Sequence, residues 1–378
     1  MFAYTDDIDR WMAEAERPAA GDAPELSAPR NRRFGLTMFA ALTLIALVWL
    51  ANSPAGPPAT GIRIRRDAII GVTSDGRERW RHTTPAGLEN VRTELGRESL
   101  VLAGKNPGAF ALVQHVNQLA DSSPRAGTLY RFTPNGEVVS AFAFTDRHAF
   151  GGRPYLGPWA LTDFAVDEDA PVRRIAVTAH DYTWSPGIVT ILDERFQRHG
   201  TFVNSGWIEH ARWLSRDRLG IAGFNESRDG GMVALIDANA ADGASPEDVA
   251  KFTCDDCPDG RPLKYIVFPR SELNRVTGSR FNRAYLDITP AGAVARTDEV
   301  ATDHGTGGLI EAIYELTPSL DIARATYGSR YWDQHRALEA AGTLTHTRAT
   351  CPERDGPPIA LVWDRETGWR TVDLKSRR

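Results

Sequence analysis

The stretch LYRFTPNGEVVSAFAF, residues 129–144, joins two apolar runs through a four-residue turn. In TPNG (133–136), proline presets φ for the first central position of a type I turn, and glycine suits the left-handed position that follows. The sequence therefore predicts a hairpin of two antiparallel strands. Similar turns stand in IIGVTSDGRERW (69–80) and AYLDITPAGAVART (284–297), so we expect the hairpin to repeat.

Further hairpin centres are expected near Glu194, Ala238 and Glu366, and the widest gap leaves room for another unit around ELTPSLDIARAT (315–326). The centres lie roughly 44 to 76 residues apart, and periods near 40 to 50 residues with several strands per unit are typical of propeller blades. A blade cannot bury both of its faces alone, so copies must pack around a common axis. We therefore predict an all-β fold, with a six- or seven-bladed β-propeller over residues 62–378. A pair of β-sandwiches is the alternative.

Two local features accompany this prediction. We expect the first strand, IRIRRDAIIGV (62–72), to pair with the last, WRTVDL (369–374), or to lie beside it, and so close the ring. Between later strands, SRYWDQHRALEAAG (329–342) places Tyr331 and His335 on one helical side and ends on glycine, which predicts a short helix whose aromatic face packs in the core.

Residues 34–51, FGLTMFAALTLIALVWLA, carry no charge. As a helix they would be about 27 Å long, which predicts a transmembrane span. A buried core helix and a cleaved signal peptide are the alternatives; the apolar character on all faces disfavours the first, and the long acidic segment ahead of the run disfavours the second. A Pro/Gly-rich linker, residues 52–61, follows.

The arginines on either side of this run predict its orientation. The cluster that adjoins the run is expected to dominate over the one that lies further away, so residues 1–33 are predicted to be cytoplasmic and the large domain extracytoplasmic, periplasmic or extracellular. The nearer cluster is Arg30, Arg32 and Arg33, and the further one is Arg63, Arg65 and Arg66.

Two short stretches resemble known families. FAYTDDIDRWM (2–12) lies in a segment predicted to form an amphipathic helix, and it resembles the final strand and helix of MerR or excisionase-type helix-turn-helix domains. SDGRERW (74–80) resembles one repeat of quinoprotein-like or WD-like propellers, in which a Gly and a Trp recur in each blade and dock neighbouring blades. The second resemblance implies a divergent β-propeller. Because the pair occurs once here, no quinone or other cofactor is expected.

Three cysteines lie in the predicted extracytoplasmic part: Cys254 and Cys257 in FTCDDCPDGRP, and Cys351 in ATCPERDG. The C-x2-C spacing suits half of a metal site or a disulfide, and a complete zinc site needs four ligands. An oxidising compartment favours a disulfide that involves this loop. Free thiols, and a metal held by Cys254 and Cys257, remain the alternatives.

Three groups of His and Asp residues are candidates for acid–base chemistry at a propeller mouth, because a carboxylate can orient an imidazole that titrates near neutral pH. They are His180 with Asp181, His210, and Asp303 with His304 in a glycine-rich stretch. Histidines of this kind more often lie in a loop or in the core without a catalytic role. The glycine-rich stretch after His304 lacks the Lys and Ser/Thr of a phosphate loop, so it does not predict nucleotide binding.

The net charge of −5, with both signs interspersed, argues against a nucleic-acid-binding surface. One span, one linker and one repeat domain without a recognised catalytic set predict a non-enzymatic module, anchored in the membrane through residues 34–51. Such a module would bind a protein or small ligand at the propeller mouth, for sensing or scaffolding at the cell envelope. The alternative is a propeller-type envelope enzyme, a hydrolase, lyase or arylsulfotransferase-like protein that uses axial His and Asp residues.

Overall fold

The computed structural model describes residues 57–84, 87–90, 99–102, 107–115, 127–168, 173–279, 282–300 and 310–374. All of them belong to the second of two compact units, which begins at Gly56. The amphipathic helix, the apolar run 34–51 and most of the linker therefore lie outside the described residues. Among the residues that are described, no helix combines the length and the apolar character needed to cross a membrane.

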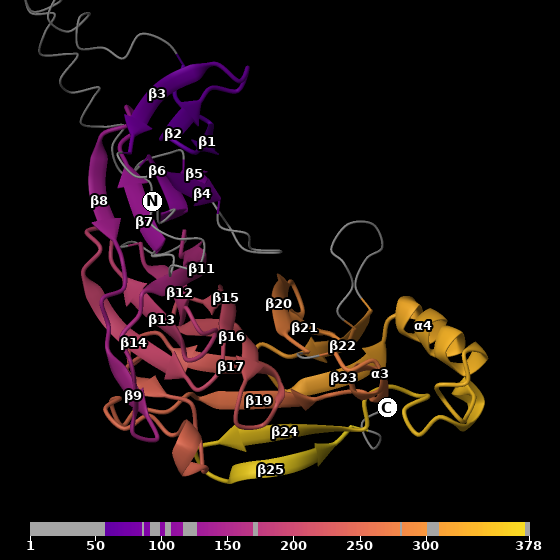
Figure 1. Cartoon of the computed structure of the whole chain (residues 1–378). Helices are drawn as coiled ribbons and strands as arrows, with labels where there is room; N and C mark the ends of the chain where they lie inside the picture. The colour runs from indigo at the N-terminus through magenta and orange to yellow at the C-terminus, as the bar shows by residue number, and fades with distance from the viewer. Residues whose placement is uncertain are drawn as a thin grey trace, which may run out of the picture. The chain divides into compact units, whose positions relative to one another are not determined.

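The chain is predominantly β, as the sequence predicts, and its strands form several separate sheets (Figure 1). Sheet A contains β1 (Gly61–Arg65), β2 (Ala68–Val72) and β3 (Glu78–Thr83). Sheet B contains β4 (Leu88–Asn90), β5 (Ser99–Leu102), β6 (Gly108–His115), β7 (Gly127–Phe132) and β8 (Val138–Phe142). The small sheet C is the hairpin of β9 (His148–Phe150) and β10 (Arg153–Tyr155).

Three larger sheets follow. Sheet D contains β11 (Trp159–Val166), β12 (Ile175–Asp181), β13 (Gly187–Leu192), β14 (Arg198–Asn204) and the short β18 (Gly243–Ala244), which pairs parallel to β14. Sheet E contains β15 (Ile208–Ser215), β16 (Arg218–Asn225), β17 (Gly230–Asp237), β19 (Lys264–Pro269), β24 (Ile359–Asp364) and β25 (Gly368–Asp373). Sheet F contains β20 (Ala284–Thr289), β21 (Gly292–Asp298), β22 (Glu311–Leu316) and β23 (Ile322–Tyr327).

The predicted turn at 133–136 is confirmed, and it recurs with the same two backbone hydrogen bonds. Gly136 donates to the carbonyl of Thr133, and Thr133 donates to that of Glu137. The fourth residue of the turn has a positive φ in every copy. The copies are 73–76 in sheet A, 133–136 in sheet B, 193–196 in sheet D and 317–320 in sheet F.

The equivalence of TPNG and TPAG, in contrast, is wrong. Thr289 pairs directly with Gly292, which makes a two-residue loop between the first two strands of sheet F. The true counterpart in that sheet is TPSL (317–320), where Leu320 takes the positive φ of 57°. The hairpin centre predicted near Ala238 is also wrong, because β17 pairs with β19 and the intervening chain crosses to sheet D as β18.

Alternation along the strands explains why these sheets stack. In β6, Phe110 and Leu112 join a core shared with sheet D, whereas Ala109, Ala111 and Val113 join a core shared with sheet A. Successive residues of a strand point to opposite faces, so one strand serves two cores. Separate cores fill the spaces between sheets A and B, B and D, D and E, and E and F.

The predicted ring closure is wrong. The segment 62–72 is a hairpin of β1 and β2 and not one strand, because the chain turns at Arg66 and Asp67. The last strand, β25, pairs with β24, which in turn pairs with β19, so the chain's end extends sheet E (Figure 1). In the described part of the chain the strands form no closed sheet.

Short helices lie between the strands. The predicted helix is confirmed as α4 (Ser329–Ala340), with Tyr331 and His335 buried and Gly342 at φ 71° after its end. The others are α3 (Glu272–Val276) and the 3-10 helices η1 (Ala250–Phe252) and η2 (Arg348–Thr350). A small separate core beneath α4 contains Tyr331 and Trp332 together with Leu273 of α3.

Candidate functional site

Two tryptophans from two connections between strands, and an arginine from a third, meet beside the first predicted candidate, His180. The ring of His180, near the end of β12, stacks on Trp184 with 5.0 Å between centroids, and lies 5.2 Å from Trp207. Trp184 and Trp207 are 4.5 Å apart. Arg283, just before β20, lies over Trp207 at 5.2 Å. We call His180, Trp184, Trp207 and Tyr182 the Trp184 patch.

The β12–β13 turn presents Trp184 to solvent. The Asp181 carboxylate accepts hydrogen bonds from the backbone N–H and the hydroxyl of Thr183, at 3.1 and 2.9 Å. The N–H of Trp184 donates to the carbonyl of Asp181. With the turn fixed in this way, Trp184 is 53% exposed and the neighbouring Tyr182 is 54% exposed.

Trp184 also has a strained backbone, with φ 80°. Such a conformation costs a bulky residue about 1 to 3 kcal/mol. Leu320 has a similar φ but is fully buried, and its burial contributes about 1.5 to 3 kcal/mol, which offsets the strain. Trp184, in contrast, keeps half of its surface exposed despite the strain. An observed backbone outlier of this kind supports a hypothesis of function.

The electrostatics of the patch keep the imidazole of His180 neutral and apart from the carboxylate of Asp181. Burial lowers the pKa of His180, so the ring is neutral near pH 7. Its Nδ1 lies 2.6 Å from the backbone carbonyl oxygen of Asp181, and the carboxylate of Asp181 is engaged by Thr183. The predicted carboxylate–imidazole pair is therefore adjacent in sequence but is not a hydrogen-bonded pair of side chains.

His210, on β15, has a structural hydrogen bond. Its Nε2 accepts from the backbone N–H of Leu286 at 2.7 Å, which ties sheet E to sheet F. Burial, together with the nearby charge of Arg212, lowers the pKa of His210 to about 3. A ring that stays neutral throughout the physiological range suits a structural link better than acid–base catalysis. Asp303 and His304 lie outside the described residues.

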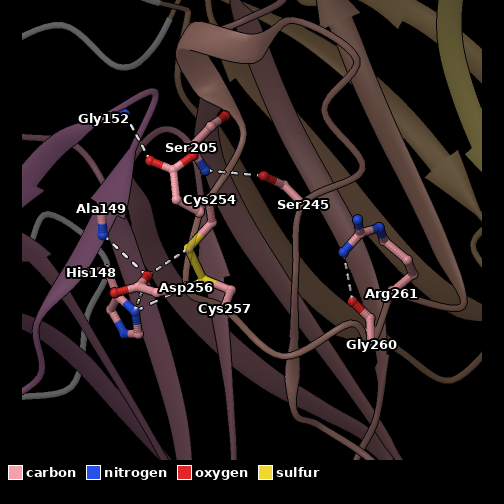
Figure 2. The surroundings of a disulfide bond; sticks show 11 residues. His148, Ala149, Gly152, Ser205, Ser245, Cys254, Asp256, Cys257, Gly260 and Arg261 are labelled. Atoms are coloured by element: carbon pink, nitrogen blue, oxygen red, sulfur yellow. Dashed lines mark hydrogen bonds and ion pairs between the residues drawn. A yellow bond between two sulfur atoms is a disulfide. The ribbon is translucent and has the colours of Figure 1, made fainter.

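Cys254 and Cys257 form a disulfide, and their loop lies against the β9–β10 hairpin (Figure 2). The N–H of Ala149 donates to the Asp256 carboxylate at 3.1 Å, and the Nδ1 of His148 lies 3.4 Å from the same oxygen. Beyond the disulfide, the loop is thus held by hydrogen bonds to the hairpin. Cys351 is a free, buried thiol at the end of η2.

Replacing Cys254 and Cys257 together with serine should lower the free energy of unfolding by about 2 kcal/mol, because the closed loop holds only four residues and constrains the unfolded chain little. Urea denaturation measures the loss. Reduced wild-type protein should match the double variant. Equal stability of all three forms would show that the hydrogen bonds of the loop suffice without the disulfide.

Two buried carboxyl groups lie at the start of α3. Glu299 accepts the N–H of Ser271 at 3.1 Å, and Glu353 accepts the N–H of Glu272 at 3.1 Å. The hydroxyls of Tyr327 and Tyr331 also donate to Glu353, at 2.7 and 2.9 Å. Burial is the main cause that raises the pKa of Glu299 to about 7, and the charge of Glu353 adds to it.

The sequence predicts His180 as a candidate, but it does not predict the aromatic residues around it. The signal was present in DYTWSPG (181–187), a turn sequence with two aromatic residues between two strands. Nothing local in the sequence indicates that Trp207 and Arg283, from later connections, join Trp184. That contact depends on how sheets D, E and F pack.

No protein-family model matches this chain, and no curated protein matches it. Among solved structures, one match is the crystal structure of a variant ACO/RPE65 chimera, at 12% sequence identity and a TM-score of 0.28, over 84% of this chain and 68% of that one. A TM-score of this size carries no argument about the fold or the function.

Proposed function

We propose that the chain is a membrane-anchored binding module of β-propeller type, which docks a protein partner on the Trp184 patch at the cell envelope. The observation that carries this proposal is the exposed Trp184, held at φ 80° against His180 and Trp207. Trp, Tyr and Arg dominate the binding energy of protein interfaces. The patch offers Trp184 and Tyr182 to a partner, on a base that Trp207 and His180 make rigid.

Different observations support the proposed propeller-type architecture and the proposed extracytoplasmic location. Stacked antiparallel meanders, each covering its neighbour through a shared core, support a propeller-type arrangement. The uncharged run 34–51 and the arginines before it support an anchor with the large domain outside the cytoplasm. A Cys254–Cys257 disulfide suits an oxidising compartment of that kind.

A photo-crosslinking amino acid at Tyr182 of the full-length chain, in the cells that make it, should capture one protein. The same amino acid at Ile359, an exposed residue of β24, is the matched control and should not. With that protein purified, Trp184→Ala should weaken binding at least about tenfold, the effect of losing 1.4 kcal/mol at a hot spot. Ile359→Ala should leave the affinity unchanged.

Two results would overturn the proposal. Equal capture from both positions, or equal affinities of the Trp184→Ala and wild-type chains, would show that the patch is not the docking site. Turnover by the purified full-length chain in a hydrolase and sulfotransferase screen, abolished by His180→Ala, would replace binding with catalysis.

A further inference from the structure

A second group of polar side chains lies away from the Trp184 patch, where α3, α4 and the chain after α4 meet. One ligand-type atom from each of Glu272, His335, His346 and Cys351 lies within 4.8 Å of the others. Imidazole nitrogen, thiolate sulfur and carboxylate oxygen are the donors that zinc takes in proteins. Four protein donors are also the number of a closed structural site.

His335, on α4, is oriented as a metal ligand would be. Its Nδ1 lies 2.6 Å from a carboxylate oxygen of Glu339, one helical turn away. The same oxygen accepts the backbone N–H of Arg348 at 2.9 Å, which fixes the carboxylate. The opposite nitrogen, Nε2, is fully buried and has no hydrogen-bond partner. A carboxylate on one ring nitrogen, with the other free, is the usual arrangement around a ligating histidine.

His346 and Glu272 lie on the more accessible side of the group, with side chains 21% and 23% exposed. Nε2 of His346 lies 3.2 Å from a carboxylate oxygen of Glu272, but it also makes no hydrogen bond. The rings of His335 and His346 are 5.3 Å apart and meet edge to face. Two imidazole nitrogens without hydrogen bonds thus lie in one group, and the partly exposed pair gives an ion a way in.

The sulfur of Cys351 completes the group. Its S–H donates to a carboxylate oxygen of Glu272 at 3.5 Å, and the sulfur accepts the backbone N–H of Glu353 at 3.4 Å. Zinc takes the thiolate, so binding of an ion would release the thiol proton. One thiolate and one carboxylate would balance the charge of a divalent cation, so the bound group would be neutral. Neutrality matters because an unbalanced buried charge costs several kcal/mol.

The geometry points to a binding site for one divalent transition-metal ion of the zinc type, held by Glu272, His335, His346 and Cys351. Ligands around tetrahedral zinc are about 3.3 to 3.8 Å apart, so shifts of about 1 Å would close the group on an ion. The ion would tie the chain from Gly342 to Cys351, which has little regular structure, to α3 and α4. We therefore infer a structural role.

The disulfide loop is the natural comparison. His148, Cys254, Asp256 and Cys257 form a similar group, but the two sulfurs there are bonded to each other. A disulfide removes both thiolates as ligands. The two groups can therefore be distinguished by which cysteines a bound metal needs.

The test uses the full-length chain, purified with its disulfide intact, freed of metal by a chelator and titrated with Co²⁺ and then Zn²⁺. We expect one ion per chain, with the thiolate-to-cobalt charge-transfer absorption of a cysteine ligand, and displacement of Co²⁺ by Zn²⁺. Cys351→Ser should abolish that absorption, and His346→Gln should weaken binding. The Cys254→Ser/Cys257→Ser variant and His148→Ala are matched controls that should keep both the stoichiometry and the absorption.

Glu339→Gln keeps every proposed ligand and should raise the metal dissociation constant about 10- to 100-fold, as loss of a carboxylate behind a ligating histidine does. If the Cys351→Ser variant does not fold, the titrations of Glu339→Gln and of the wild type still test metal binding at this site. Failure of the wild-type chain to bind Co²⁺ or Zn²⁺ would overturn the inference. So would charge-transfer absorption that survives Cys351→Ser or disappears with Cys254 and Cys257.

Discussion

Replacing Gly136 with valine should destabilise the domain by about 2 to 6 kcal/mol, measured as the free energy of unfolding of the full-length chain in urea. Gly136 has φ 86°, which strains a β-branched residue by about 1 to 3 kcal/mol. A Cβ at this position would also lie 2.4 Å from the ring of Trp80, which belongs to the neighbouring sheet. Overpacking of that kind costs about 1 to 3 kcal/mol more.

Gly76 is the matched control, because it holds the same place in the same turn of sheet A. It has φ 81°, but a Cβ there would have no atom within 4 Å. Gly76→Val should therefore cost only the backbone strain, about 1 to 3 kcal/mol. Equal losses for the two variants would mean that the contact with Trp80 contributes nothing. No loss in either would contradict the left-handed turn itself.

Trp80 shows what a short motif can and cannot predict. The resemblance of SDGRERW to a propeller repeat implies that its Trp docks a neighbouring blade. In the structure Trp80 lies between Gly71 of its own sheet and Gly136 of the next, with its ring 4.9 Å from Phe132. The local motif therefore predicts a contact between sheets A and B. It does not predict how later sheets join, since the Trp is not repeated.

The turns explain both the success and the error in predicting strands. A glycine marks the positive φ at Gly76 and Gly136, and the sequence shows it directly. At Leu320 the same conformation is adopted by a residue that avoids it locally, and burial in the core between sheets E and F compensates. Sequence patterns report only local conformational preference. They therefore do not predict a turn that is stabilised by tertiary packing.

The candidate sites depend even more on tertiary structure. Adjacency of His180 and Asp181 suggested a catalytic pair, but alternation along β12 and the following turn direct the two side chains to different partners. The C-x2-C spacing predicts a disulfide or half of a metal site at Cys254 and Cys257. The group around Cys351 has no short motif, because Glu272 comes from a distant helix and His335 and His346 from either side of a loop.

Replacing Glu299 with glutamine should raise the stability of the domain relative to the wild type by about 3 kcal/mol as the pH rises from 4.5 to 8. The pKa of Glu299 rises from its ordinary 4.5 to about 7 in the folded protein, chiefly through burial. Between these values the unfolded chain loses its proton and the folded chain keeps it. The free energy of unfolding therefore falls as pH rises from about 4.5 to 7, by about 1.4 kcal/mol per pH unit, and the loss is complete above pH 7.

Glutamine matches the protonated carboxyl in size and has no proton to lose, so it removes this part of the pH dependence. The measurement is a series of urea denaturation curves at pH 4.5 to 8 for the wild type, for Glu299→Gln, and for Glu315→Gln as an exposed control on β22. Any constant offset of the Glu299 variant reflects its altered hydrogen bonds to Ser271 and Thr297. The slope of the difference against pH reports the titration alone. A difference between wild type and Glu299→Gln that does not grow between pH 4.5 and 7, or that grows equally for Glu315→Gln, would mean that the buried carboxyl of Glu299 is ionised in the folded protein.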